Sequence, residues 1–356
     1  MNLMLQDIYG DQRIIREKVI PPELVLNSPN FCRAMMGLSV PKGVYVHVAG
    51  VDLIENERGE FLVLEDNLRV PSGVSYLLEN RIVMSRVVPD LLKRHRVRRV
   101  DHYPQILLEA LRNMSEKADP SIVVLTPGIY NSAYFEHSYL AAQMGVQLVE
   151  GRDLIVDDNK VYMKTTSGLK SVDVVYRRVD DEFMDPVAFR SDSILGVPGL
   201  MNAYRKKNVV LANAPGTGVV DDKAMYVFVP DAIRFYLDEE PLLPQVPTYM
   251  GGRPDDLSYM LDHLKELVVK PTDGSGGGRS HAVCARRVSS SSVFESVMEP
   301  SALTEREPTL DAMNLPASQS WSTSRRRACT SACGAQLSTT HRPSASSVAS
   351  ALSGTS

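Results

Sequence analysis

The chain has 356 residues, of which 44% are hydrophobic and 23% are charged, and its formal net charge is −4. This balance is typical of a globular protein of about two domains and excludes disorder of the whole chain. No run of about 18 apolar residues is present, and Asp7 and Asp11 interrupt the segment where a signal peptide would carry its apolar core, so we expect a cytoplasmic protein. The near-neutral charge predicts neither nucleic acid nor a membrane as a partner.

The composition changes near residue 277. Residues 278–356 contain 19 serines, three of the four cysteines and the single tryptophan, whereas all 12 lysines and all 14 tyrosines precede them. Residues 1–277 carry 31 basic and 38 acidic side chains, against 8 and 5 in the second part. The second part also holds too few large apolar side chains to offset the entropy lost on ordering. We therefore expect a globular part up to residue 277 and a disordered, low-complexity tail over 278–356.

The first predicted elements are helices and a β-hairpin. Residues 12–31 mix apolar and charged positions as a helix does, with a break at Pro21 and Pro22. Residues 43–54 and 60–67 are rich in β-branched and alternating side chains, and a turn sequence separates them. This pattern predicts two antiparallel strands joined by a short turn.

An α/β region is predicted further along the chain. A helix should begin at residue 74, and the basic run at 91–102 is most often a solvated helix face. Residues 121–151 then give a buried strand, a helix ended by Gly145 and a second strand, which is a β-α-β unit. A hairpin-like pair is expected from residues 160–166 and 172–179, and ligands of such a domain bind at the carboxyl ends of its strands.

The segment 266–277 contains the strongest single signal for function. A strand carries Lys270 near its end and runs into a glycine-rich loop, whose backbone N–H groups can approach a polyphosphate while the ammonium neutralises it. The Walker A spacing is absent from the sequence. A plain turn is the alternative interpretation of the loop. The loop residues that would contact phosphate are Gly274, Ser275, Gly276 and Gly277.

The predicted hairpin carries a second group of candidate residues. Alternation places Glu65 and Asn67 on one face of their strand, and the turn brings Asp52 across from them. Such hard oxygen donors suit Mg²⁺, which takes one or two carboxylates and leaves its other positions to water and nucleotide phosphates. Arg69 falls on the same face, where it could hold a phosphoryl oxygen during transfer. The alternative is a set of ion pairs on an exposed sheet face.

Weaker signals come from three basic residues. Lys223 follows Asp222 and precedes an apolar stretch, so it could be a second phosphate ligand, although an isolated lysine is usually a surface residue. Arg177 and Arg178 close a predicted strand and could bind an anionic substrate. The alternative for these two arginines is an exposed cluster of ion pairs with the acidic residues that follow.

Together these segments resemble the ATP-grasp superfamily. Its members carry a lysine-bearing strand with a glycine-rich flap, a second lysine upstream, and an acidic residue followed by the pattern Glu-x-Asn-x-Arg. Here the corresponding segments are VVKPTDGSGG, Asp222-Lys223, Asp52 and Glu65-x-Asn67-x-Arg69. The metal-binding strands precede the lysines, which is the order of a circular permutation. The chain thus resembles the circularly permuted ATP-grasp type 2 family, relatives of glutathionylspermidine synthase.

The resemblance implies a fold, a reaction and its cofactors. The fold would be α/β, a circularly permuted ATP-grasp with an inserted Rossmann-like pre-ATP-grasp domain. The reaction would join a small-molecule or peptide carboxylate to an amine at the expense of ATP, through an acyl phosphate. ATP would be held by Lys223, Lys270 and the glycine-rich flap, and Mg²⁺ by Asp52, Glu65 and Asn67, with Arg69 as the catalytic residue. Arg177 and Arg178 would suit a substrate carboxylate.

From the resemblance we expect four segments, and the chain departs from the family pattern at its two ends. The metal-binding lobe would span residues 1–100, the pre-ATP-grasp domain 101–205, the partial nucleotide-binding lobe 206–277 and the tail 278–356. The first family helix should begin before Met1, and we interpret the tail as an out-of-frame translation. The alternative function is therefore an impaired remnant that only binds nucleotide and Mg²⁺. A dinucleotide-binding enzyme is disfavoured because its glycine fingerprint is absent.

Overall fold

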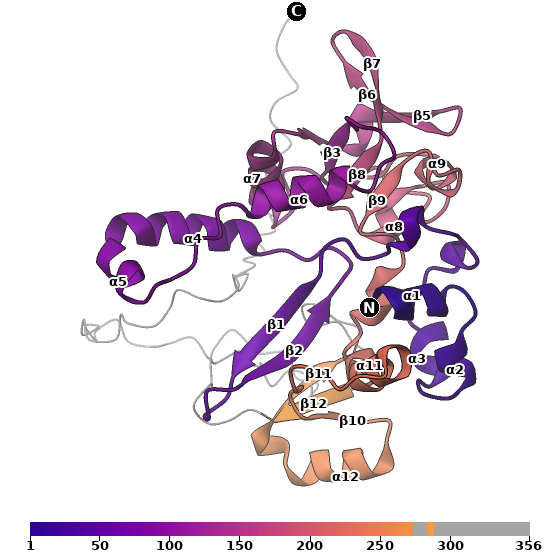
Figure 1. The fold of residues 1–356 in the computed structure, drawn as a ribbon. Helices are drawn as coiled ribbons and strands as arrows, with labels where there is room; N and C mark the ends of the chain where they lie inside the picture. Colours follow the sequence, from indigo (N-terminus) through magenta and orange to yellow (C-terminus); the bar gives the residue numbers. More distant parts are fainter. Residues whose placement is uncertain (273–282, 288–356) are drawn as a thin grey trace, which may run out of the picture. The chain divides into compact units, whose positions relative to one another are not determined.

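A computed structural model describes residues 1–272 and 283–287 of the chain (Figure 1). The predicted phosphate loop, Gly274 to Gly277, and most of the predicted tail lie outside the described residues. The helices are α1 (Asn2–Ile8), α2 (Arg13–Arg16), α3 (Pro22–Leu26), α4 (Val74–Val87), α5 (Pro89–Arg94), α6 (Tyr103–Arg112), α7 (Tyr134–Met144), α8 (Asp181–Met184), α9 (Leu200–Arg205), α10 (Lys223–Tyr226), α11 (Val229–Leu237) and α12 (Pro254–Asp262). Short 3₁₀ turns are η1 (Arg33–Met35), η2 (Pro41–Gly43), η3 (Gly151–Asp153), η4 (Thr217–Val220) and η5 (Leu264–Glu266).

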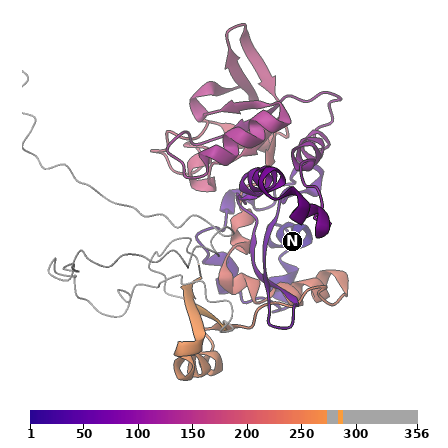
Figure 2. The ribbon, with the colours of Figure 1, turned by 90° about the vertical axis from the view of Figure 1, so that its left-hand side faces the viewer.

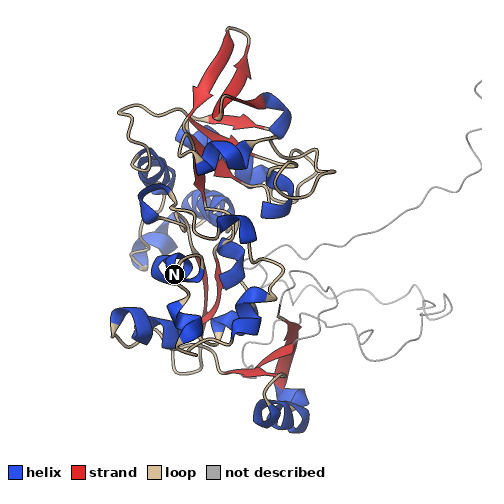
Figure 3. Ribbon diagram, turned by 90° about the vertical axis from the view of Figure 1, so that its right-hand side faces the viewer, coloured by secondary structure: helices blue, strands red, loops and turns tan. Residues whose placement is uncertain are grey.

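The strands form separate sheets, drawn as red arrows in Figure 3. A hairpin of β1 (Gly50–Glu55) and β2 (Phe61–Asn67) is antiparallel. A parallel sheet has the order β4-β3-β8-β9, formed by β3 (Ile122–Leu125), β4 (Gln147–Val149), β8 (Val174–Arg177) and β9 (Val210–Ala212). Two antiparallel sheets are β5-β6-β7, from β5 (Leu154–Asp157), β6 (Lys160–Thr165) and β7 (Gly168–Val172), and β10-β12-β11, from β10 (Thr248–Met250), β11 (Leu267–Pro271) and β12 (Val283–Arg287).

The predicted β-α-β unit is confirmed as β3, α7 and β4, with β3 and β4 parallel. Gly145 ends α7 in the left-handed conformation at φ +68°, which a glycine adopts without steric cost. Both faces of the parallel sheet are buried, so its strands are almost wholly apolar. Alternate strand residues such as Val124 pack with α6 and α7, while their neighbours such as Val123 join the apolar cluster that contains α9. The fourth strand, β9, lies beyond residue 205, where the predicted domain boundary stood.

The predicted hairpin of residues 160–166 and 172–179 is wrong. Strand β6 pairs instead with β7, and β8 leaves that sheet to lie beside β3 in the parallel sheet. Asp173 fixes the switch between sheets, because its carboxylate accepts hydrogen bonds from the Ser121 backbone (2.9 Å) and from Lys117 Nζ (2.6 Å). Burial provides the physical reason for the switch, since all of β8 is buried whereas most of β7 is exposed.

The β1/β2 hairpin forms as predicted, but its first strand begins at Gly50 rather than at residue 43 (Figures 1 and 2). Two asparagine side chains occupy the backbone N–H groups that a longer strand would need. Asn2 Oδ1 accepts from Tyr45 and Val46, and Asn213 Oδ1 accepts from residues 47 and 48. The edge of β2 that faces away from β1 is also covered. The Val63 N–H donates to the Pro244 carbonyl oxygen, and the Val63 carbonyl oxygen accepts from the Val246 N–H.

Two further predictions are corrected. The helix expected over residues 12–31 is divided into α2 and α3 and is preceded by α1. Asp7 caps α2, since its carboxylate accepts from the Arg13 and Ile14 N–H groups, and Lys18 then leaves the helix at φ +60°. Residues 283–287, which the sequence placed in the tail, form β12 and pair antiparallel with both β10 and β11. Backbone pairing needs no particular side chain, so composition alone could not indicate this strand. Among residues 1–272 and 283–287, the helices lack the length and apolarity needed to cross a membrane.

We predict that His137 makes folding sensitive to acid. Its buried imidazole lies 2.9 Å from the Thr126 hydroxyl, and burial followed by the nearby Arg178 charge lowers the pKa of His137 to about 3. The unfolded chain takes up this proton near pH 6.5, so the unfolding free energy falls as the pH falls. Between about pH 7 and about pH 4 the loss should be about 3 kcal/mol. In His137→Gln this part of the pH dependence should disappear in urea titrations, whereas an unchanged slope would contradict the assignment. His95→Gln, at an exposed histidine, is the matched control.

Candidate active site

A β-bulge organises the acidic residues of the β1/β2 hairpin. From the turn inward, Glu55 pairs with Phe61 and Leu53 with Val63, and the register then shifts so that Asp52 pairs with Glu65. Leu64 is the extra residue of β2. If the register did not shift, Asp52 would face Leu64, and Glu65 would point to the other side of the hairpin, because side chains alternate along a strand. With the bulge, Asp52, Glu65 and Asn67 share one face, as the sequence predicted.

The Asp52 and Glu65 carboxyl groups interact directly. Desolvation raises the pKa of Asp52, and Glu65 raises it further through its negative charge and a shared hydrogen bond. The positive charge of Lys270 acts on Asp52 in the opposite direction and lowers its pKa. Lys270 is remote from the hairpin in sequence, and the fold brings it close enough for its charge to act on Asp52.

Helix α10 connects the two predicted lysine positions to the hairpin. The backbone N–H of Lys223 donates to the Thr272 carbonyl oxygen at 3.0 Å, just beyond the end of β11. Asp222 begins the helix by accepting from the Ala224 N–H at 2.8 Å. At the other end of α10, the Tyr226 hydroxyl donates to the carbonyl oxygen of Val63 in β2. The elements that carry both lysines therefore lie beside the hairpin.

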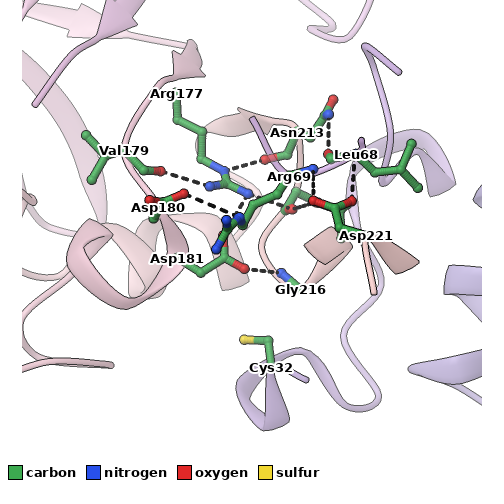
Figure 4. Close-up of polar contacts among 12 residues, drawn as sticks. Cys32, Leu68, Arg69, Arg177, Val179, Asp180, Asp181, Asn213, Gly216 and Asp221 are labelled. Atoms are coloured by element: carbon green, nitrogen blue, oxygen red, sulfur yellow. Dashed lines mark hydrogen bonds and ion pairs between the residues drawn. The ribbon is translucent and has the colours of Figure 1, made fainter. Parts of the chain in front are cut away.

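Arg69 extends from the end of the hairpin toward the carboxyl end of β8 (Figure 4). Its Nε lies 3.4 Å from Asp180 Oδ1, and both side chains remain about one-third exposed. The backbone beneath it is fixed by Asp221, whose carboxylate accepts from the Leu68 and Arg69 N–H groups at 2.6 and 3.2 Å. Burial raises the pKa of Asp221 to about 6, while these hydrogen bonds and the Arg69 charge lower it. Arg69 is thus positioned at its backbone and weakly paired at its guanidinium.

Asn213 attaches both ends of the hairpin to the parallel sheet. Its buried side chain accepts from the His47 and Val48 N–H groups and donates to the Val48 and Leu68 carbonyl oxygens, at 2.5–2.9 Å. These four hydrogen bonds use both N–H donors and both oxygen lone pairs of the amide side chain. The hairpin therefore has a fixed position against the end of β9.

The guanidinium of Arg177 is fully used inside the protein (Figure 4). Its Nε and Nη2 donate to the carbonyl oxygens of Asn213 (2.6 Å) and Ala214 (3.1 Å), and Nη1 donates to Val179 (2.9 Å). Nη2 also lies 2.7 Å from Asp181, whose other oxygen accepts from the Gly216 N–H. These contacts favour a structural role for Arg177 over the predicted contact with a substrate.

Arg178 is also buried in an ion pair. Its Nη2 lies 3.2 Å from Glu136 Oε1, and both side chains are almost completely shielded from water. Nη1 donates to the Pro71 carbonyl oxygen at 2.6 Å, and Glu136 Oε2 accepts from the Gly73 and Ser75 N–H groups at the start of α4. Both arginines form ion pairs, but in the interior rather than in an exposed cluster, and Arg178 pairs with Glu136 rather than with the acidic residues that follow it. The substrate role predicted for them has no support from these contacts.

A polar cavity of about 430 Å³ opens beside the Arg69–Asp180 pair. Both signs of charge occur on its wall, from Arg33, Arg69, Asp180 and Glu182. Sequence reasoning missed Asn213 and Asp221, because each acts through hydrogen bonds to segments far away in the chain. It also missed Arg33, which joins the cavity wall only in the folded chain. Asn213 directly follows β9, and Asp221 follows the turn η4.

The hairpin donors fit Mg²⁺ better than a metal that needs a complete protein cage. Two carboxylates and one amide oxygen are hard ligands, and Mg²⁺ usually keeps further positions for water and phosphate. Within the described part of the chain, no group of three or more His, Cys, Asp or Glu side chains is arranged to hold a metal ion. A magnesium ion on the three hairpin donors would take its remaining ligands from water and from nucleotide phosphates. The metal and nucleotide roles of all the predicted residues stay predictions.

Comparison with known proteins gives a consistent result. Residues 1–302 match the family model described as a circularly permuted ATP-grasp. An uncharacterized protein of Mycobacterium tuberculosis is 58% identical over 275 residues, which cover 77% of this chain and 50% of that protein. An uncharacterized protein of Synechocystis is 55% identical over 279 residues, covering 78% of this chain and 58% of that protein. The chain therefore spans about half the length of these curated relatives.

A relative from Frankia casuarinae carries a name that refers to an activity. It is named provisionally as a glutamate–cysteine ligase, and it is 42% identical over 281 residues, covering 78% of this chain and 32% of that protein. The family predicted from the sequence is confirmed at the level of the permuted ATP-grasp. The relation to glutathionylspermidine synthase stays a prediction.

We predict that the Glu136–Arg178 pair is structural. Glu136→Leu or Arg178→Met alone leaves one buried charge without its partner, which should cost about 3–5 kcal/mol of unfolding free energy. The double variant should lose less than the sum of the single losses, because no unpaired charge remains. Urea titrations of the four proteins measure these differences. Single losses below about 1 kcal/mol would contradict the structural role and return Arg178 to the candidates for substrate binding.

Proposed function

Because the chain belongs to the family of circularly permuted ATP-grasp proteins, we propose that it takes part in an ATP-dependent ligation of a carboxylate to an amine. The observation that carries the proposal is the convergence of Lys270 with the Asp52–Glu65 pair, since the charge of Lys270 acts on Asp52 across the fold. A lysine whose charge reaches a pair of carboxylates suits a phosphate chain and its divalent cation. The provisional name of the Frankia relative agrees with small carboxylate and amine substrates.

The proposed nucleotide site uses the two lysines from adjoining elements. Lys270 near the end of β11 and Lys223 at the start of α10 would neutralise the phosphates of ATP. The hydrogen bond between Lys223 N–H and Thr272 holds the two elements together. The loop from Gly274 to Gly277 follows directly and would supply further N–H groups to the phosphates.

Mg²⁺ would bind to Asp52, Glu65 and Asn67 on the common face of the hairpin. When bound, it would neutralise charge on the transferred phosphoryl group. The two carboxyl groups destabilise each other through their charges, so a divalent cation would relieve that repulsion. The residues of this chain would thus contribute mainly by position and charge, as expected for phosphoryl transfer.

The proposed reaction has two steps. A substrate carboxylate oxygen attacks the γ-phosphorus of ATP, the bond to the bridging oxygen breaks, and ADP leaves as the acyl phosphate forms. The amine nitrogen then attacks the acyl carbon, the C–O bond to phosphate breaks, and an N–H proton is lost as the amide forms. Arg69 is the proposed catalytic residue, because within the described part of the chain its guanidinium is ion-paired only with Asp180, at 3.4 Å, and can turn to the phosphoryl oxygens.

The cavity beside Arg69 is the proposed site for the substrates. Its wall offers Arg33 and Arg69 to a carboxylate, and Asp180 and Glu182 to an ammonium group. A small molecule or peptide that carries both charges would match this lining. The alternative function, a module that binds nucleotide and Mg²⁺ without turnover, predicts binding but no formation of ADP.

We predict that Lys270→Ala strongly reduces ADP formation, whereas substitution of the nearby Lys265 has no effect. ADP formation with ATP, Mg²⁺ and a panel of amino acids and small peptides should fall by about a hundredfold in Lys270→Ala, because one preorganised cation at the phosphates is lost. Lys265→Ala is the matched control, since Lys265 is exposed and precedes the same strand. A wild type that binds ATP but forms no ADP would support the binding module instead. Equal activity of the two variants would refute the assignment of Lys270.

We predict that the two paired carboxylates of the hairpin are needed for Mg²⁺. Asp52 and Glu65 face each other across the strands, so Asp52→Asn together with Glu65→Gln removes both charged donors, and Mg²⁺-dependent binding of ATP in calorimetric titrations should be lost. Glu60→Gln is the matched control, because Glu60 is exposed just before β2 and its substitution should leave the binding as in the wild type. Circular dichroism shows whether the double variant is folded. A folded double variant with undiminished Mg²⁺-dependent affinity would exclude this metal site.

A further inference from the structure

The arm formed by α4, α5 and the segment up to residue 102 encloses a cavity of about 570 Å³ against α7. It shares no lining residue with the cavity beside Arg69. Its walls come from α4, α5, residues 96–101, the start of α6 and the α7 side chains Tyr139 and Gln143. The arm (residues 74–102) is attached to α7 through its first turn, where Glu136 accepts from the Gly73 and Ser75 N–H groups.

The rim of this cavity is strongly basic. Residues 81–102 contain seven arginine or lysine residues and two aspartates, although the whole chain has a net charge of −4. The only acidic residue in the lining is Asp101, which is already paired with Arg99. Among residues 1–272 and 283–287, no carboxylate lies within ion-pair distance of Lys93, Arg96 or Arg98. The five basic residues in the lining are Arg81, Lys93, Arg96, Arg98 and Arg99.

The floor of the cavity is apolar. Leu78 and Pro104 are buried beneath it, while Ile82 and Val97 reach its surface with 36% and 40% of their area exposed. The same arm exposes further large apolar side chains outside the cavity lining. They are Val83, Met84, Val87 and Leu91. A solvated basic helix face, which the sequence suggested, would not combine its charges with an open apolar cavity.

We infer that this cavity binds an acidic peptide segment of a partner protein, one that carries both carboxylate and apolar side chains. The cations of the rim would pair with an anionic ligand, and the apolar floor would bury the ligand's apolar side chains. Nucleic acid fits less well, because it needs an extended basic track for its phosphates and aromatic side chains for its bases. Tyr139 is the only aromatic side chain in the lining.

Fluorescence anisotropy with a labelled peptide of alternating glutamate and leucine tests the inference on the full chain. The peptide should bind, and added NaCl should weaken the binding because the ion pairs are screened. The charge reversals Lys93→Glu and Arg96→Glu together should lower the affinity at least about tenfold. Arg205→Glu with Lys206→Glu, at two exposed positions outside the arm, changes the net charge equally and should leave the affinity unchanged.

Two further comparisons distinguish the contribution of the ligand's charge from that of its apolar side chains. An all-glutamate peptide of equal length should bind at least about fivefold more weakly, and Ile82→Ser should weaken the glutamate–leucine peptide but hardly affect the all-glutamate one. Circular dichroism of each variant excludes unfolding as the cause. Absence of binding, equal loss in the control pair, or tighter binding of a single-stranded oligonucleotide would overturn the inference.

Discussion

The amide side chain of Asn213 fixes the hairpin of the candidate site to the parallel sheet. It joins β9 to the backbone on both sides of β1 and β2 through hydrogen bonds with residues 47, 48 and 68. An apolar residue here would leave those backbone groups buried without partners, at about 1–3 kcal/mol each. Arg177 then holds the Asn213 and Ala214 carbonyl oxygens from β8. The position of Arg69 and of the acidic hairpin face depends on this interaction.

The β-bulge in β2 is the second feature that positions the candidate site. The bulge at Leu64 places Glu65 opposite Asp52, and the contacts of α10 with Val63 and Thr272 bring the end of β11 to the same place. A one-residue change in register would separate the carboxylates, because it would move one of them to the other face. The site is therefore specified by register as much as by residue type.

Sequence patterns predicted the parts of this arrangement that depend on neighbours in the chain. Alternation identified the hairpin, and strand–helix–strand periodicity identified β3, α7 and β4. The failures concern contacts between distant segments. The buried positions of Arg177 and Arg178, the passage of the chain into β8 and the late start of β1 all depend on partners that no local pattern reveals. In each of these cases, burial in the folded chain outweighed the local propensity of the sequence.

The central claim is that Asp52, Glu65 and Lys270 form one site for ATP and Mg²⁺. A crystal structure of the chain with Mg²⁺ and a non-hydrolysable ATP analogue tests it most directly. The account predicts that Mg²⁺ is coordinated by Asp52 and Glu65 and that Lys270 Nζ contacts a phosphate oxygen of the same nucleotide. A nucleotide bound away from the hairpin, or a phosphate chain that leaves Lys270 and the two carboxylates without a contact, would contradict the claim.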